Sequence, residues 1–264
     1  LELIEAARER GVEVTADQYP FEASGGGLVP DTLPHSFQAG RSPEQISADL
    51  GRPEVRAQLH DAVAAAIARR GGADRLFMSS YPAAEVLGKS IAQLSAEMGG
   101  DPAEVVMALL AESRGAGASW TCFSMHADDV ERFMRWPGLM VGSDGSSLSI
   151  EGPLSRGNPH PRNFGTFTRI LGLYVREKRV LRLEEAVRKM TSLPAQTFGL
   201  AGRGTLAPGN WADLVLFDLE RVTYAPYEAP KTYPLGLPRV MVNGRWVIRD
   251  GAFTGTLPGS ALSS

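Results

Sequence analysis

Several features that define whole classes of protein are scarce or missing in these 264 residues. The single cysteine, Cys122, excludes an internal disulfide framework and favours a reducing compartment, so we expect a cytoplasmic protein. No apolar run approaches the roughly 20 residues of a membrane-spanning helix. The net charge of −3 provides no basic surface, and nucleic acid is not expected as a partner. The chain starts at Leu1, inside a helical pattern and without a secretory leader, so we expect the later part of something longer.

Histidine is also rare. The four histidines are His35, His60, His126 and His160. None forms a His-x-His or another pair at metal-ligand spacing, and none follows a clear strand. We therefore interpret the first three as surface or structural residues, and the fourth as a residue that shapes its loop. Cys122 is interpreted as a small core residue.

The residues that are present predict an α/β protein. The apolar fraction of 43% and the charged fraction of 22% are typical of a globular protein. A helical pattern followed by a Gly turn and a strand pattern occurs twice, at 1–18 and at 128–143. A helix followed by a strand is half of an α/β unit. Mostly helical patterns lie between them. A hairpin at Asn243-Gly244 indicates a small β unit at the end. The expected divisions are 1–29, 30–118, 119–200 and 201–264.

Two of the predicted strands end in polar side chains. Val12, Val14 and Ala16 alternate with polar residues, and this strand runs on to Tyr19. The apolar run from Leu139 ends at Ser143 and Asp144. In a β/α barrel, polar residues at the carboxyl ends of strands carry the chemistry. Asp144 is therefore a candidate site residue, although Asp-Gly by itself is an ordinary turn pair.

Four motifs together resemble a known family. They are Asp-Gln-Tyr-Pro-Phe at 17–21, Ser-Asp-Gly at 143–145, His-Pro-Arg-Asn-Phe-Gly-Thr-Phe-Thr-Arg at 160–169, and 204–213 with the Val-Asn-Gly hairpin. In this order they resemble the C-terminal half of N-acyl-D-amino-acid deacylases (D-aminoacylases), in the metal-dependent amidohydrolase superfamily. The fourth motif is common to most of that superfamily, whereas the first and third are much narrower.

The resemblance implies a fold. It predicts the C-terminal portion of a TIM-type β/α barrel, with a helical insertion that covers the active site and a portion of a small β-sandwich. The strand at Val12 would be the seventh barrel strand, and Leu139–Ser143 the eighth. A partial barrel exposes strand edges, so self-association is expected.

The resemblance also implies site residues. Zinc brings its bound water to a pKa of roughly 7, and a carboxylate beside that water can move its proton. Asp144 matches the family's catalytic Asp, which lies close to the metal, and could also be a metal ligand. The remaining zinc ligands would precede Leu1. Arg162 matches the Arg that binds the substrate carboxylate, and Tyr19 a Tyr that assists it. From composition alone, Arg162 would be a surface ion-pair residue and Tyr19 a packed strand-end residue.

The function implied is part of a zinc-dependent hydrolase that cleaves N-acyl-D-amino acids to a carboxylate and a D-amino acid. The expected partner is this small molecule, and the chain alone is expected to be inactive. Two alternatives remain. A cyclic-amide amidohydrolase, similar to dihydropyrimidinases or hydantoinases, fits 204–213 equally well, but His160-Pro-Arg162 argues against it. A catalytically incomplete fragment or scaffold fits the missing metal ligands.

Overall fold

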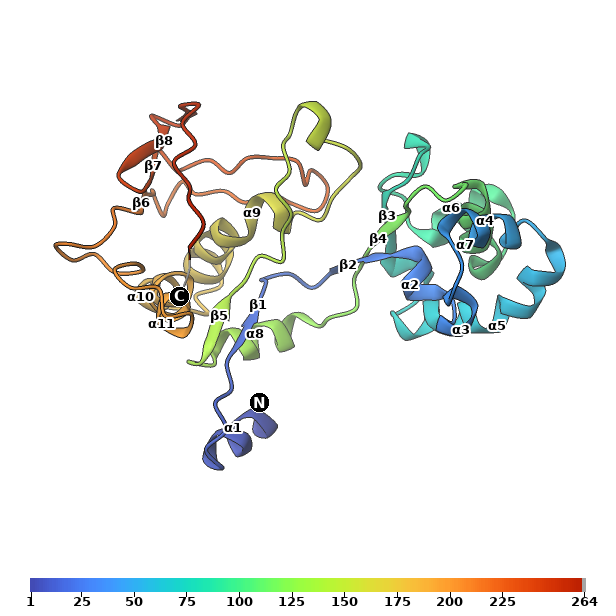
Figure 1. The fold of residues 1–264 in the computed structure, drawn as a ribbon, viewed down its shortest axis with the longest axis horizontal. Helices are drawn as coiled ribbons and strands as arrows, with labels where there is room; N and C mark the ends of the chain where they lie inside the picture. The colour runs from blue at the N-terminus through green and yellow to red at the C-terminus, as the bar shows by residue number, and fades with distance from the viewer. Residues whose placement is uncertain (263–264) are drawn as a thin grey trace. The chain divides into compact units, whose positions relative to one another are not determined.

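The computed structural model describes residues 1–262 and consists of two compact units (Figure 1). Unit 1 comprises 1–20, 127–148 and the chain from 161 onward, and unit 2 comprises 21–126 and 149–160. None of the helices in the described residues is long and apolar enough to cross a bilayer.

The helices of unit 1 follow the sequence pattern closely. They are α1 (Glu2–Glu9), α8 (Ala127–Arg135), α9 (Arg162–Arg169), the π-helical segment η4 (Ile170–Glu177), α10 (Leu183–Met190) and α11 (Ser192–Thr197). The helix predicted at the start of the chain is confirmed. Gly11 follows it with φ +80°, a backbone conformation that glycine adopts without strain.

Unit 1 contains a parallel pair of short strands. In β1 (Ala16–Gln18) and β5 (Leu139–Val141), Ala16 pairs with Leu139 and Gln18 with Val141 (Figure 1). All three β5 residues are buried, which confirms a strand covered on both faces. The prediction that the first strand starts at Val12 was wrong. Val12 is 52% exposed and lies before the paired residues. The strand begins only at Ala16, the first residue that has a partner in β5.

Helix α10 anchors the beginning of β5. Lys189 is fully buried and donates to the backbone oxygens of Trp136 and, at 3.1 Å, of Leu139. Arg188 donates to the oxygen of Pro137 at 2.5 Å. Burial lowers the pKa of Lys189, while the carboxylate of Glu185, 3.5 Å away, acts in the opposite direction. Two cations of one helix therefore fix the turn that leads into β5.

The C-terminal part of unit 1 is an antiparallel sheet. Its order is β6 (Leu214–Leu216), β7 (Arg239–Val242), β8 (Arg245–Arg249) and β9 (Ala252–Phe253). Asn243 and Gly244 connect β7 to β8 with φ of 49° and 75°, as a type I′ turn requires. The predicted hairpin is confirmed.

Unit 2 packs its helices against a three-stranded antiparallel sheet. Its strands, in the order β2-β4-β3, are β2 (Ser24–Gly27), β4 (Ser119–Cys122) and β3 (Leu76–Ser80). Its α-helices are α2 (Leu28–Thr32), α3 (His35–Gln38), α4 (Pro43–Leu50), α5 (Pro53–Arg69), α6 (Ile91–Met98) and α7 (Pro102–Glu112). Short 3₁₀ turns are η1 (Ala73–Arg75), η2 (Ala84–Val86) and η3 (Gly152–Leu154).

The glycine run at 25–27 belongs to β2, opposite β4, and passes close to the partly buried carboxylate of Asp31. A Cβ at Gly26 would lie 2.0 Å from Oδ2 of Asp31. That oxygen accepts from Nε1 of the buried Trp120 at 2.8 Å, and Arg70 donates to the other carboxylate oxygen at 2.8 Å. Glycine thus serves close packing here.

Candidate functional site

Two candidate site residues follow the carboxyl ends of the paired strands. Tyr19 comes directly after β1, and Asp144 follows β5 after Gly142 and Ser143. Because β1 and β5 are parallel, these ends lie at the same edge of the pair. Asp144 has φ +46°, a left-handed conformation that Asp tolerates better than most residues. Its side chain is 68% exposed, so the carboxylate is open to solvent.

Arg162 brings these two residues into one group. It is the first residue of α9, and its Nη2 lies 3.1 Å from Oδ2 of Asp144. Its Cζ lies 5.1 Å from the centre of the Tyr19 ring, within the range of a cation–π contact. The guanidinium side chain is only 14% exposed. The three residues selected from the sequence therefore meet within unit 1, and their roles stay predictions.

The backbone after Asp144 is fixed on the first turn of α9. A Cβ at Gly145 would come within 3.4 Å of the oxygen of Arg162 and the Cα of Asn163. The backbone N–H of Ser146 donates to Oδ1 of Asn163 at 2.7 Å. Any side chain at position 145 would tighten this contact. The loop and the helix therefore hold Asp144 and Arg162 as a pair.

The sequence reasoning missed a second arginine at the other end of α9. Arg169 is buried, and its Nε donates to the backbone oxygen of Pro20 at 2.7 Å. The hydroxyl of Tyr174 donates to the same oxygen at 3.4 Å. Arg162 and Arg169 are seven residues apart, a spacing that puts both on one face of a helix. That spacing, together with Tyr19-Pro20, was the signal available in the sequence.

The remaining histidines and the cysteine lie in unit 2. His160 is buried, with Nε2 2.9 Å from the oxygen of Ala23 and its ring edge-on to Phe21 at 5.0 Å. These contacts fit a residue that shapes its loop. His35 and His126 are exposed, whereas Cys122 is buried in the core.

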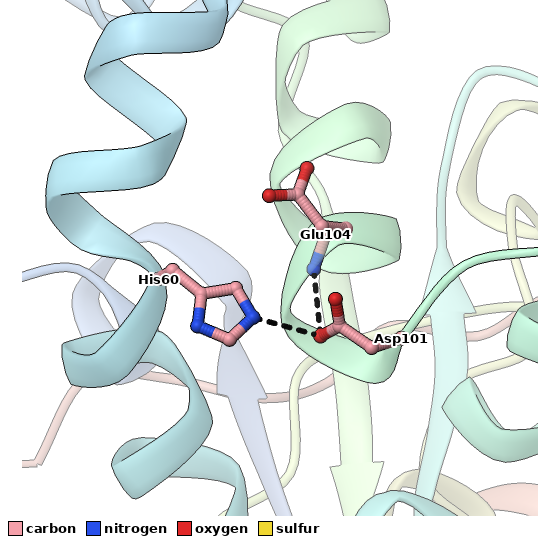
Figure 2. Close-up of side chains that lie close together, drawn as sticks. All are labelled: His60, Asp101 and Glu104. Carbon is pink, nitrogen blue, oxygen red and sulfur yellow. Dashed lines mark hydrogen bonds and ion pairs between the residues drawn. The ribbon is translucent and has the colours of Figure 1, made fainter.

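One cluster of potential metal ligands lies on the surface of unit 2. Figure 2 shows His60 on α5 facing Asp101 and Glu104 at the start of α7, with ligand atoms within 4.8 Å of one another. Nε2 of His60 lies 3.2 Å from Oδ1 of Asp101. The same oxygen accepts from the backbone N–H groups of Ala103 at 2.9 Å and Glu104 at 3.3 Å. Asp101 is therefore the N-cap of α7.

The charges around this cluster favour a structural role. Hydrogen bonds to Asp61 and then to Asp101 raise the pKa of His60. Nε of Arg56 lies 3.6 Å from Oε2 of Glu104 and already balances that carboxylate. A divalent ion would have to compete with Arg56 for Glu104 and with the hydrogen bonds of His60 to Asp61 and Asp101. The cluster joins α5 to the capped end of α7 and belongs to a different unit from Asp144.

The described residues near Asp144 do not fit a zinc site by themselves. A protein zinc site uses at least three His, Cys, Asp or Glu ligands. Within residues 1–262, the His60 cluster is such a group of three, and no such group includes Asp144. The carboxylate of Asp144 faces Arg162 instead. We therefore derive no chemical step from a metal at this position.

A cleft of about 650 Å³ in unit 1 lies at the opposite end of the strand from Asp144. Its lining residues include Pro137 and Gly138, which precede β5, and three arginines. Arg188 in this lining is paired with Glu185, and Arg135 with Glu131. The cleft is therefore separate from the group around Arg162.

Polar side chains at the carboxyl ends of parallel strands are typical of α/β enzymes that act on small molecules. An arginine among them suits an anionic substrate. A model described as the amidohydrolase family matches residues 2–248 of this chain. The chain belongs to this family.

Particular relatives cover nearly the whole chain. An N-acyl-D-glutamate deacylase of Alcaligenes xylosoxydans xylosoxydans is 36% identical over 242 residues, which are 91% of this chain and 40% of the relative. One similar structure is the crystal structure of N-acyl-D-glutamate deacylase from Bordetella bronchiseptica, complexed with zinc and a phosphonate inhibitor. It matches with a TM-score of 0.69 at 35% identity, and the match covers 93% of this chain and 42% of that one. A D-aminoacylase structure, described for its binuclear metal centre, has a TM-score of 0.70 at 32% identity, with coverage of 97% and 44%. The chain thus spans less than half the length of these relatives.

Proposed function

We propose that this chain is part of a zinc-dependent amidohydrolase that cleaves N-acyl-D-amino acids to a carboxylate and a D-amino acid. The observation that carries the proposal is the group in which Arg162 contacts both Asp144 and Tyr19 at the ends of the parallel strands. The relatives at 32–36% identity are N-acyl-D-amino-acid deacylases, and one was solved with zinc. The first line of support concerns the residues of the candidate site, and the second concerns the class of substrate.

Arg162 has the chemistry to bind the substrate's free carboxylate. A guanidinium is always charged and presents N–H donors that match a carboxylate. In this structure one nitrogen, Nη2, contacts the carboxylate of Asp144, so an anionic group is already accommodated there. We propose that the substrate carboxylate takes up this contact, with the Tyr19 ring holding the guanidinium in place. Asp144 is then released from the ion pair when substrate binds.

Asp144 has the chemistry to move a proton. Its carboxylate is exposed, stands at the end of β5, and can accept a proton from water and pass it to the leaving nitrogen. General acid–base groups typically contribute about 10²–10⁴-fold to a rate. The zinc ion of the whole enzyme would polarise the amide carbonyl, with ligands that the described residues do not provide.

The experiment measures kcat and KM of the zinc-loaded full-length protein, and of its Asp144→Asn and Arg162→Ala variants. The substrates are an N-acyl-D-amino acid and its methyl ester. We expect Asp144→Asn to lower kcat at least about 100-fold without raising KM, because it loosens the competing ion pair. Arg162→Ala should raise KM for the free acid and spare the ester.

Four results would count against the proposal. A wild-type-like kcat in Asp144→Asn would exclude this residue as the base. Equal losses on acid and ester in Arg162→Ala would exclude carboxylate recognition. Turnover of cyclic amides in preference to N-acyl amino acids would favour the dihydropyrimidinase-like alternative, and no turnover at all would favour the incomplete scaffold.

We also propose the finer architecture that this function requires. β1 and β5 would be neighbouring strands of a TIM-type β/α barrel, and the sheet from β6 to β9 part of a β-sandwich. The segment 30–118 would be the helical insertion. The parallel pairing of β1 with β5 and the antiparallel order of β6 to β9 support this arrangement. The single Cys122 supports a cytoplasmic location.

A further inference from the structure

Helix α9 touches both strand ends of the candidate site through two arginines. At its start, Arg162 contacts Asp144 and the ring of Tyr19. At its end, Arg169 donates from Nε to the backbone oxygen of Pro20, the residue that follows Tyr19. The spacing of seven residues spans about two helical turns, so both arginines reach the same segment. The segment Tyr19-Pro20 is therefore held at its side chain by one arginine and at its backbone by the other.

The surroundings of Arg169 fix its guanidinium. The residue is 8% exposed, and its Cζ lies 5.2 Å from the centre of the Tyr224 ring. The hydroxyl of Tyr174 donates to the same Pro20 oxygen at 3.4 Å. A buried charge-assisted hydrogen bond at 2.7 Å is stronger than one between neutral groups. Proline adds rigidity, because its ring restricts the backbone between the anchored oxygen and Tyr19.

We propose that Arg169 is a positioning residue for substrate recognition: by holding the Pro20 carbonyl it sets the Tyr19 ring against Arg162, and so orients the guanidinium that receives the substrate carboxylate. Arg169 itself does not touch the substrate. This inference rests on the proposed function, since it assigns Arg162 and Tyr19 to the free carboxylate of an N-acyl amino acid.

The test compares Arg169→Met and Arg169→Lys in the zinc-loaded full-length protein. Lysine retains one charged N–H donor for the Pro20 oxygen, whereas methionine retains only the apolar chain. For Arg169→Met we expect KM for the free acid to rise about tenfold, equivalent to about 1.4 kcal/mol of binding. KM for the methyl ester and kcat for both substrates should stay within about twofold, a free-energy change of less than about 0.5 kcal/mol. Arg169→Lys should recover most of the loss.

Arg176 provides a matched control. It is also an arginine that donates to backbone oxygens, those of Leu219 at 2.9 Å and Val222 at 2.8 Å, but neither belongs to the candidate site. Arg176→Met should therefore lower stability without changing the ratio of the two KM values. If Arg169→Met behaves like Arg176→Met, or changes acid and ester equally, Arg169 is only a structural residue and the proposal fails.

A crystal structure of Arg169→Met gives a readout that does not depend on activity. We expect the Tyr19 ring to move away from Arg162, beyond the present 5.1 Å between ring centre and Cζ. If both side chains stay in place, the positioning role is refuted. A wild-type protein that hydrolyses no N-acyl amino acid would instead refute the proposed function, and the ring movement would still decide how Arg169 acts on Tyr19.

Discussion

Replacing Lys189 by methionine tests whether α10 holds the strand that carries the candidate site. Lys189 is fully buried, and its ammonium group serves the oxygens of Trp136 and Leu139 just before and within β5. A hydrogen bond from a charged donor contributes about 1.5–3 kcal/mol. Methionine fills similar space but removes the charged donor from both oxygens, of which that of Trp136 still accepts from the backbone N–H of Leu139 at 3.1 Å, while it removes the cost of burying a charge. The net loss should be about 3 kcal/mol, near the lower end of the range for breaking a buried ionic contact.

Urea unfolding of the full-length protein measures this loss. With m-values of about 1–3 kcal/mol/M, the midpoint should fall by at least about 1 M. Hydrogen exchange of Leu139–Val141 should accelerate as well, because the anchor of β5 is lost. Lys178→Met is the control: Lys178 is partly exposed and pairs with Glu131 at 2.8 Å, a contact expected to contribute about 0–1 kcal/mol. If both variants lose the same stability, Lys189 does not anchor the strand as described.

Two further predictions concern local contacts. The pKa of His60 is raised in the folded protein. The stabilisation from His60 is therefore complete below its unfolded pKa of about 6.5 and is lost as pH rises through its folded pKa. His60→Ala should lower Tm more at pH 5.5 than at pH 8.5, and equal losses would contradict this. Gly165→Ala places a Cβ 2.7 Å from the backbone nitrogen of Ala225. Chemical denaturation should therefore show that the free energy of unfolding falls by about 1–3 kcal/mol. The control is Gly259→Ala, whose Cβ would have no atom within 4 Å and which should change that free energy by less than about 0.5 kcal/mol.

Local signals made much of the fold predictable. Asn243-Gly244 specifies its hairpin through two residues with positive φ, and Asp101-Pro102 specifies the start of α7 through a side-chain cap and a fixed φ. In each case the information lies within four residues of the structure that it determines. The polar pair Ser143-Asp144 after the apolar run was visible for the same reason, although β5 ends at Val141 and not at Ser143 as predicted.

Contacts between distant segments were not predictable in this way. Arg169 and Pro20 are 149 residues apart, and Lys189 lies 50 residues from Leu139. The seven-residue spacing from Arg162 places Arg169 on the same helix face, but it does not identify Pro20 as the acceptor, and no spacing around Lys189 identifies Leu139. β2 was not predicted because Ser24–Gly27 has no apolar alternation, and the close approach of Asp31 to Gly26 is visible only in the folded structure. The grouping of Arg162 with Asp144 and Tyr19 came from motif resemblance, and hydrophobic periodicity alone would not have found it.

The pairing of β1 with β5 has a consequence for the order of folding. Roughly 120 residues separate Gln18 from Leu139, and closing so long a loop carries a large entropic cost. Within that stretch, Ser24 pairs with Cys122 across β2 and β4. Once unit 2 has formed, the free chain left to close is only about 20 residues, which reduces the closure cost by about 1.5 kcal/mol. The entropic cost of pairing β1 with β5, the strands that precede Tyr19 and Asp144, is therefore lower once unit 2 has folded.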